Sequence, residues 1–232
     1  MLDIVKDVLQ KFYETIIESG YYKLLLGGFE KTIQITLGAL AIGIVIGTVI
    51  SIIKYFGEDV RWLKPFCKLC NLYITVIRGI PVTVLLLIFY YGIFVTDDGM
   101  LTAVVTFGIN SGAYMAELIR GGIQSVDKGQ MEAGRSLGLS KMQTMGKIIF
   151  PQAIRYVLPA IGNEMIALLK ETSVAGYVTI IDLTFAGNLI RNNTFDAYSP
   201  LFLVALTYLV LVVILTKLLS IVERRLAKSD KG

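Results

Sequence analysis

The chain has 232 residues, of which 55% are hydrophobic and 17% charged, with a formal net charge of +4 and a mean hydropathy of +0.68. A soluble domain carries about 25% charged residues, so this composition excludes an ordinary soluble protein and predicts membrane spans of about 20 residues each. The small net charge gives no reason to expect a nucleic-acid partner. We therefore expect an all-α, polytopic membrane protein.

The first 30 residues, 1–30, are predicted to form a separate N-terminal segment. Its beginning mixes charges throughout and lacks the apolar core and small-residue cleavage site of a secretory signal peptide. Apolar residues recur at helical spacing, with charged residues opposite them; they are Val5, Val8, Leu9, Phe12, Tyr13 and Ile16. This pattern predicts an amphipathic helix that lies in the membrane interface or packs on the protein's own spans.

Five apolar segments follow and predict a transmembrane domain over residues 31–224 with a tail at 225–232. The segments are 31–53, 70–95, 99–120, 149–169 and 199–222, and the fourth is the most polar. Span one contains Ala39, Gly43 and Gly47, a face of small residues that allows helices to approach closely in lipid.

Lysine and arginine counts predict the orientation of these spans. The segments 54–69 and 120–148 and the C-terminal end are rich in basic residues, whereas 92–99 has none and 171–198 has only Arg191. Because short basic loops stay in the cytoplasm, the alternation fits five spans with the N-terminus outside and the C-terminus in the cytoplasm.

Two features near the second span admit more than one interpretation. Cys67 and Cys70 form a CxxC pattern, but the chain has no histidine and no second cysteine pair, so a zinc site lacks ligands and two small residues on one helix face are favoured. Arg78 is placed at the beginning of span two, where stabilisation of a helix end or contact with lipid headgroups is favoured over a gate or substrate contact.

Ionisable residues within spans are costly and usually face a pathway. Glu117 lies near the end of span three, and Glu164 lies within span four beside Asn163, whose amide is both donor and acceptor. Carboxylates that share a cavity can bind the ammonium or a cationic side chain of an amino acid. The alternative is structural, with Glu117 paired to Arg120 and Glu164 to a neighbouring cation.

The polar segment at about 124–148 carries helix start and stop signals. Asp127 can cap a helix that Gly138 ends in a left-handed conformation, and Ser140 with Gln143 matches a capping box. Two short helices joined at Gly138 are therefore predicted.

The next proline, Pro151, is expected to open or kink the fourth span. A short amphipathic helix presented in this way suits insertion into a groove of another protein, and the alternative is a solvated loop.

The same segment resembles the EAA motif of ATP-binding-cassette (ABC) importer permeases. The matching residues are Glu132-Ala133-Gly134, Gly138, Ile148 and Pro151. The family has alanine at the position of Gly134 and usually leucine at that of Phe150. Further matches are similar to the polar amino acid branch of the family: Arg78-Gly79-Ile80-Pro81, Asn110 to Tyr114 with Glu117, Arg120 to Ile123, Leu158 to Ala160, Gly162 to Glu164, and Leu169 to Ser173.

The resemblance implies a type I ABC importer permease fold in a bacterial cytoplasmic membrane. It implies a subunit that moves a polar, preferably basic, L-amino acid and is coupled through residues 127–151 to a separate ATPase. The implied partners are ATPase subunits that use ATP, a second permease copy or paralogue, an extracytoplasmic substrate-binding protein and membrane lipid. No cofactor bound by this chain is implied. Consistent with this, the chain has no GxxxxGK[ST] phosphate loop, and an enzyme is not expected.

Residue roles follow from the resemblance in the same way. Glu132, Ala133, Gly134 and Gly138 would couple the permease to the ATPase, and Glu117, Asn163 and Glu164 would contact the substrate. Glutamine or cystine remain alternative substrates. A stand-alone secondary transporter or channel is a second class of function, but no convincing repeat relates the two halves of the chain.

Overall fold

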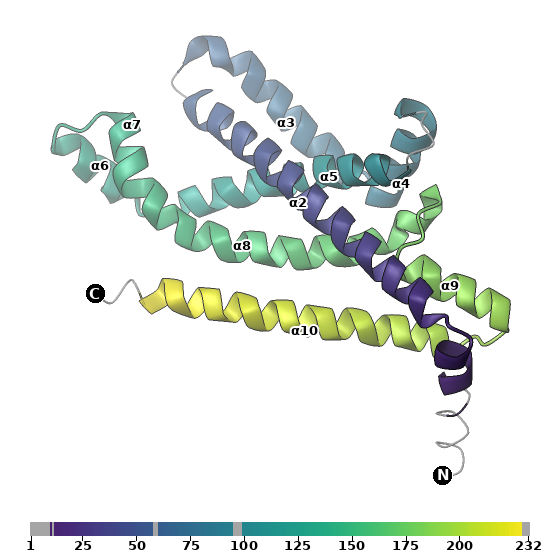
Figure 1. Cartoon of the computed structure of the whole chain (residues 1–232). Coiled ribbons are helices and arrows are strands. Elements are labelled where there is room, and N and C mark those ends of the chain that lie inside the picture. The colour runs from purple at the N-terminus through teal and green to yellow at the C-terminus, as the bar shows by residue number, and fades with distance from the viewer. Residues whose placement is uncertain (1–9, 11, 58–59, 95–98, 229–232) are drawn as a thin grey trace.

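The computed structural model describes residues 10, 12–57, 60–94 and 99–228, and every regular element within these ranges is a helix. The predicted all-α class is confirmed. Figure 1 shows the α-helices, which are α2 (Tyr22–Gly57), α3 (Lys64–Gly79), α4 (Val82–Ile88), α5 (Gly99–Gln124), α6 (Lys128–Ser136), α7 (Lys141–Thr144), α8 (Phe150–Glu171), α9 (Leu183–Thr194) and α10 (Ser199–Lys228). Short 3-10 or π segments connect several of them: η1 (Glu14–Glu18), η2 (Arg61–Leu63), η3 (Phe89–Ile93), η4 (Met145–Ile149) and η5 (Thr172–Val178).

Helices α2 and α5 form a closely packed pair in the middle of the molecule. The predicted small-residue face of α2 is buried there, and it includes Ala39, Gly43 and Gly47. A Cβ atom added to Gly43 would lie 2.8 Å from Ser111 Oγ, and one added to Gly47 would lie 2.4 Å from Met115 Cβ. Helix α5 in turn accommodates isoleucine side chains of α2 at two of its own glycines. The two backbones can approach this closely only because the side chains between them are so small.

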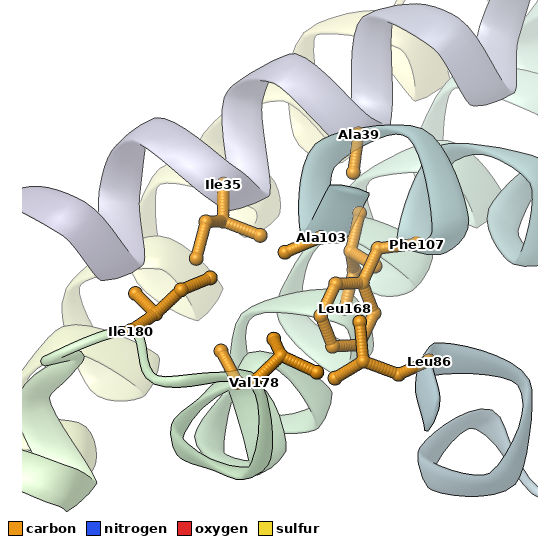
Figure 2. Close-up of a cluster of buried hydrophobic side chains, with 9 residues drawn as sticks. Ile35, Ala39, Leu86, Ala103, Phe107, Leu168, Val178 and Ile180 are labelled. Atoms are coloured by element: carbon orange, nitrogen blue, oxygen red, sulfur yellow. The ribbon is translucent and has the colours of Figure 1, made fainter. Parts of the chain in front are cut away.

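One buried hydrophobic cluster joins α2 and α5 to α4, α8 and η5, as Figure 2 shows. Its buried members are Ile35, Ala39, Leu86, Ala103, Phe107, Leu168, Ala175, Val178 and Ile180. Phe107 is the largest fully buried side chain. The cluster therefore fixes the position of α8 relative to α5, and these two helices carry the polar residues considered below.

The predicted second span, 70–95, is not one continuous helix, which corrects the sequence prediction. Helix α3 ends at Gly79, α4 begins at Val82, and the two directions differ by 106°. Pro81 has no backbone N–H and disfavours the helical conformation of the residue before it, and Ile80 is accordingly extended at φ −107° and ψ 131°. Arg78 consequently lies in the last turn of α3 and does not begin a span.

Two of the described helices, α2 and α10, are each long and apolar enough to cross a membrane, and the number rises to four if each of two bent helix pairs is one span. The bent pairs are Arg61–Gly79 with Val82–Ile93, and Lys141–Val178 with Leu183–Thr194. The predicted third span, α5, has 26 residues and is long enough. Several of its small and polar residues, including Asn110 and Ser111, are buried against the rest of the protein.

The N-terminal segment is described only in part. Residues 1–9 and 11, which carry part of the predicted amphipathic helix, lie outside the described residues, as do 58–59, 95–98 and the end of the predicted tail at 229–232. Ile16 is buried in a cluster with residues of α2, α9 and α10, and Phe12 packs against it. The described part of the segment therefore packs on the protein's own helices, which was the second of the two interpretations.

The molecule has two distinct ends along its helices. The C-terminal end of α10 lies on the same side as α6 and α7, whereas η1 lies beside α9 and the beginning of α10 at the opposite side (Figure 1). The arrangement places the α6–α7 pair at one extremity, connected to the rest by α5 and α8.

Candidate functional site

Helix α6 begins and ends where the sequence predicts. The Asp127 carboxylate accepts a hydrogen bond from the Gly129 N–H at 2.6 Å and caps the helix. At the other end Gly138 has φ +84°. Its N–H donates to the Arg135 carbonyl at 3.0 Å, and the N–H of the next residue donates to the Gly134 carbonyl at 3.1 Å. Both hydrogen bonds together are those of a Schellman motif, which requires a left-handed residue at this position.

Helix α7 follows after the connecting residues 137–140. Ser140 and Gln143 form the predicted capping box, with Gln143 N–H donating to Ser140 Oγ at 3.2 Å and Ser140 N–H donating to Gln143 Oε1 at 2.8 Å. The chain then continues through η4 into α8, with Pro151 in the first turn of that helix. The prediction of two short helices joined at Gly138 is therefore confirmed.

The residues of the EAA-like motif divide into outward-facing and inward-facing ones. Glu132 and Ala133 are exposed on α6, whereas Gly134 is buried. A Cβ atom on Gly134 would lie 2.4 Å from Thr144 Cγ2 at the end of α7 and 3.2 Å from Ile148 Cδ1 in η4, so the absence of a side chain lets α6 pack directly on both segments. The outward face also presents two large apolar side chains, Leu137 at 80% exposure and Met142 at 66%.

A second group of polar residues lies between α5 and α8, and we call it the α5–α8 polar cluster: Asn110, Ser111, Glu164 and Glu171. Ser111 Oγ donates to Glu164 Oε1 at 3.3 Å, and Asn110 Nδ2 donates to Glu171 Oε2 at 3.4 Å. The two glutamates are seven residues apart on α8, which places them two turns apart on the same helix face. Both α5 residues are buried.

Arg78 approaches this cluster from the end of α3. Its guanidinium carbon lies 4.9 Å from the centroid of the Tyr114 ring, within cation–π range. Its charge also interacts with that of Glu164, and so does the charge of Glu171. Because α3 ends at the break before Pro81, Arg78 lies in the last turn of α3 beside α5, where its side chain is exposed.

Glu117, predicted to face the substrate, is held in an ion triplet instead. Its Oε1 lies 3.2 Å from Lys54 Nζ on α2, and its Oε2 accepts hydrogen bonds from the Arg120 guanidinium, including one from Nε at 3.0 Å. Ser111 precedes Glu117 by six residues, or about 9 Å along the helix axis. The structure therefore places Glu117 nearer to the α6–α7 end than to the α5–α8 polar cluster.

Asn163 lies beside Glu164 in sequence but makes a different contact. Its side-chain amide donates to the Pro159 carbonyl one turn earlier at 3.1 Å, and the residue is exposed. Of the three residues predicted to bind substrate, Glu164 is the one whose described hydrogen bond connects α5 with α8.

Glu171 was missed as a site residue. The signal that could have found it is its spacing of seven from Glu164 on one predicted helix, which places two carboxylates on one face. The participation of Asn110 and Ser111 depends on how α5 packs against α8, and the sequence alone does not show this.

The arrangement is that of a polytopic helical membrane protein with a solvent-exposed helical pair at one end and a polar cluster inside. The chain belongs to the family described as the binding-protein-dependent transport system inner membrane component, whose sequence profile matches residues 39–228. The predicted ABC permease family and type I importer fold are thereby confirmed, and the chain is a transport subunit of the membrane.

Relatives of known name cover almost the whole chain. A probable glutamine ABC transporter permease protein, GlnM, of Bacillus subtilis is 36% identical over 211 residues, which are 90% of this chain and 95% of the relative. The arginine transport system permease protein ArtQ of the same organism is 35% identical over 211 residues, covering 89% and 94%. The glutamine transport system permease protein GlnP of Escherichia coli K12 is 36% identical over 208 residues, covering 88% and 93%.

Solved structures show the same fold. A chain in the crystal structure of an amino acid ABC transporter with histidines superposes with a TM-score of 0.82 at 37% identity, covering 90% of this chain and 96% of that one. A chain of the inward-facing MetNI methionine ABC transporter gives a TM-score of 0.73 at 20% identity, covering 88% and 96%. The second similarity supports the fold alone.

Proposed function

We propose that this chain is the permease subunit of an ATP-driven importer that moves a cationic L-amino acid through a pathway at the α5–α8 polar cluster. The observation that carries the choice of substrate is the pair of carboxylates, Glu164 and Glu171, on one face of α8 and directed at α5. Relatives named for amino acid transport support the general class.

The charges of the cluster favour a substrate with an additional positive charge. The two carboxylates are half-buried, whereas the two cations that interact with them, Arg78 and Lys170, are both exposed. An amino acid with a neutral side chain would leave the carboxylates without a cation on the side that faces α5. Leaving a buried charge uncompensated is costly, whereas a guanidinium or ammonium side chain would pair with it. The Arg78 cation is suited to the substrate's own carboxylate, and Asn163 borders the cluster through its neighbour Glu164.

The α6–α7 pair supplies the coupling surface in this proposal. Glu132, Ala133, Leu137 and Met142 are exposed and combine a charge with apolar contacts, as a helix inserted into a protein groove requires. We infer that this groove belongs to an ABC ATPase, so the α6–α7 end lies in the cytoplasm and the η1 end faces outward, where a substrate-binding protein would deliver the amino acid. A second permease copy or paralogue completes the pathway, and ATP is used by the ATPase.

The experiment is a binding and transport comparison on the purified complex of the chain with its ATPase and permease partner. Arginine, lysine, histidine, glutamine and cystine are tested on the parent and on Glu171→Gln and Glu164→Gln variants. Loss of one charge-assisted contact is expected to weaken arginine binding by about 10-fold or more while glutamine is affected less. Glu223→Gln, at an exposed carboxylate of α10, is the matched control and should leave both unchanged.

Two results would count against the cationic substrate. One is a parent complex that binds glutamine or cystine in preference to arginine, which would favour those alternatives. The other is a Glu171→Gln variant that transports arginine as well as the parent does. Transport by the chain without any ATPase would instead support a secondary transporter or channel.

A further inference from the structure

A cavity of about 770 Å³ lies at the α6–α7 end of the molecule, away from the α5–α8 polar cluster. Its lining residues come from the C-terminal ends of α2 and α5, from α3, from α6 and α7, and from η4, and the cavity is partly open to its surroundings. None of the four residues of the α5–α8 polar cluster lines it. The cavity is therefore a separate site, and we call it the basic cavity.

Most of the charged side chains that line the basic cavity are cations. Lys54, Arg120, Lys128 and Lys141 line it, and Asp127 is the acidic residue of the lining. Asp127 is already engaged as the cap of α6. Among the residues that the structure describes, four cations face two carboxylates even when Glu117 of the ion triplet is counted, which leaves an excess of two positive charges.

Three of the cations are held in place by neighbouring groups. Glu117 fixes Lys54 and Arg120, and Arg120 Nη1 also donates to Gln124 Oε1 at 2.7 Å. Lys141 Nζ lies 4.7 Å from the centroid of the Tyr55 ring. Because these positions are fixed by contacts within the protein, an anion that enters the cavity meets cations that are already arranged.

Neutral donors complete the lining. The side-chain amides of Asn71 and Gln124 border the same space. Multiple positive charges combined with neutral donors are the composition of sites for phosphate groups, to which lysine and arginine both bind well. The volume exceeds that of a single small ion and leaves room for a group attached to the phosphate.

We propose that the basic cavity binds a phosphate-bearing anion, either the headgroup of an anionic phospholipid or a phosphate compound from solution. Both sources present the same chemistry to the lysines. Helix α3 exposes Phe66, Leu69 and Leu72 next to its cavity-lining residues, so lipid can reach the rim of the site. Basic pockets between membrane helices bind anionic headgroups in this way.

An anion in this position would bridge the α6–α7 pair to the rest of the permease. Lys128 and Lys141 belong to the two short helices, whereas Lys54 and Arg120 belong to α2 and α5. Binding would hold the two groups together. The binding itself does not depend on the identity of the amino acid, and only its effect on transport rests on the function proposed above.

The test measures ligand retention by the full chain in its complex. The complex is reconstituted in nanodiscs of phosphatidylcholine alone or with phosphatidylglycerol, and bound lipid is counted by native mass spectrometry after transfer to detergent. Binding of radiolabelled inorganic phosphate is measured in the phosphatidylcholine nanodiscs. Retained phosphatidylglycerol without phosphate binding identifies a lipid site, and phosphate binding identifies a site for soluble anions.

The variant is the Lys128→Gln/Lys141→Gln pair. Each lysine contributes about 5-fold to the attraction of an anionic headgroup, so retention should fall by about 25-fold. The matched control is Lys64→Gln/Lys68→Gln, two exposed lysines of α3 outside the cavity lining, which should change retention little. Lys141→Arg keeps the charge and should retain binding, which separates loss of the site from loss of folding.

Two outcomes would overturn the proposal. In one, the parent retains neither phosphatidylglycerol nor phosphate. In the other, the control pair loses as much ligand as the cavity pair, which would show a general attraction of anions to the basic surface. Neither outcome would alter the arginine-binding result, so the two proposals fail separately.

Discussion

The α6–α7 pair and the α5–α8 polar cluster are stabilised in different ways. In the pair, Asp127 bonds to Gly129, Ser140 bonds to Gln143, and the Schellman hydrogen bonds close within a single turn. In the cluster, the hydrogen bonds join residues that are 53 and 61 positions apart in the chain. Local hydrogen bonds define the first region, and long-range packing defines the second.

Because of this difference, a substitution should affect the structure of the two regions in different ways. A substitution in the pair changes one cap or one turn and leaves the membrane helices in place. The cluster exists only while α5 holds its position, and that position depends on the small residues of α2 packed against it. The most damaging change to the cluster should therefore lie on α2, outside the cluster.

The largest effect is predicted for Gly47→Leu on α2. A Cβ atom there would lie 2.4 Å from Met115 Cβ, so the side chain would force α5 away from α2. Overpacking of this kind costs about 3 kcal/mol or more when backbone must move. We expect a lower thermal unfolding midpoint of the purified complex, followed by fluorescence-detected size exclusion, and weaker binding of arginine.

Gly27→Leu is the matched control, because Gly27 lies on the same helix, is exposed and has nothing within 4 Å of an added Cβ atom. Equal unfolding midpoints for the two variants would show that the α2–α5 contact does not limit stability. The α5–α8 polar cluster would then not depend on the packing of α2 against α5, contrary to the comparison made above.

The sequence predicted the α6–α7 pair in detail because its signals are local. A capping aspartate, a glycine that tolerates positive φ and a capping box act within a few residues, whatever surrounds them. The same reasoning placed Gly138 at the turn and Pro151 in the first turn of α8.

The sequence did not predict the bend in the second span, which a single proline causes, or the polar contacts between helices, which depend on tertiary packing. The 70–95 segment is mostly apolar on both sides of Pro81, so its average hydropathy does not reveal the bend that this proline introduces. The ion triplet of Glu117 includes Lys54, which lies 63 positions earlier in the chain. Glu171 accepts a hydrogen bond from Asn110 of α5, which lies 61 positions earlier. Periodicity within one helix carries no information about such partners.

A smaller effect is predicted for Gly138→Val, at the turn between α6 and α7. A β-branched residue at φ +84° costs about 1–2 kcal/mol, so the Schellman motif should open. We expect substrate-stimulated ATP hydrolysis by the complex to fall while the unfolding midpoint of the membrane helices changes little.

Gly146→Val is the control for this change, because Gly146 lies nearby in η4, has no positive φ and has nothing within 4 Å of an added Cβ atom. If the Gly138 variant melts as early as Gly47→Leu does, the turn is not an independent local unit. Unchanged coupling in the Gly138 variant would show that the α6–α7 connection does not matter for hydrolysis.

The smallest effect is predicted for Gly134→Ala, the change that would make the motif match its family pattern. The new methyl group would lie 2.4 Å from Thr144 Cγ2 and should cost about 1 kcal/mol in the packing of α6 against α7 and η4. Thr144→Ser removes that methyl group but keeps the hydroxyl that donates to the Ser140 carbonyl, so the double variant should regain the parent's coupling of ATP hydrolysis to transport. A double-variant cycle measures this interaction directly. An additive cycle would show that the Gly134→Ala effect does not arise from contact with the Thr144 methyl group.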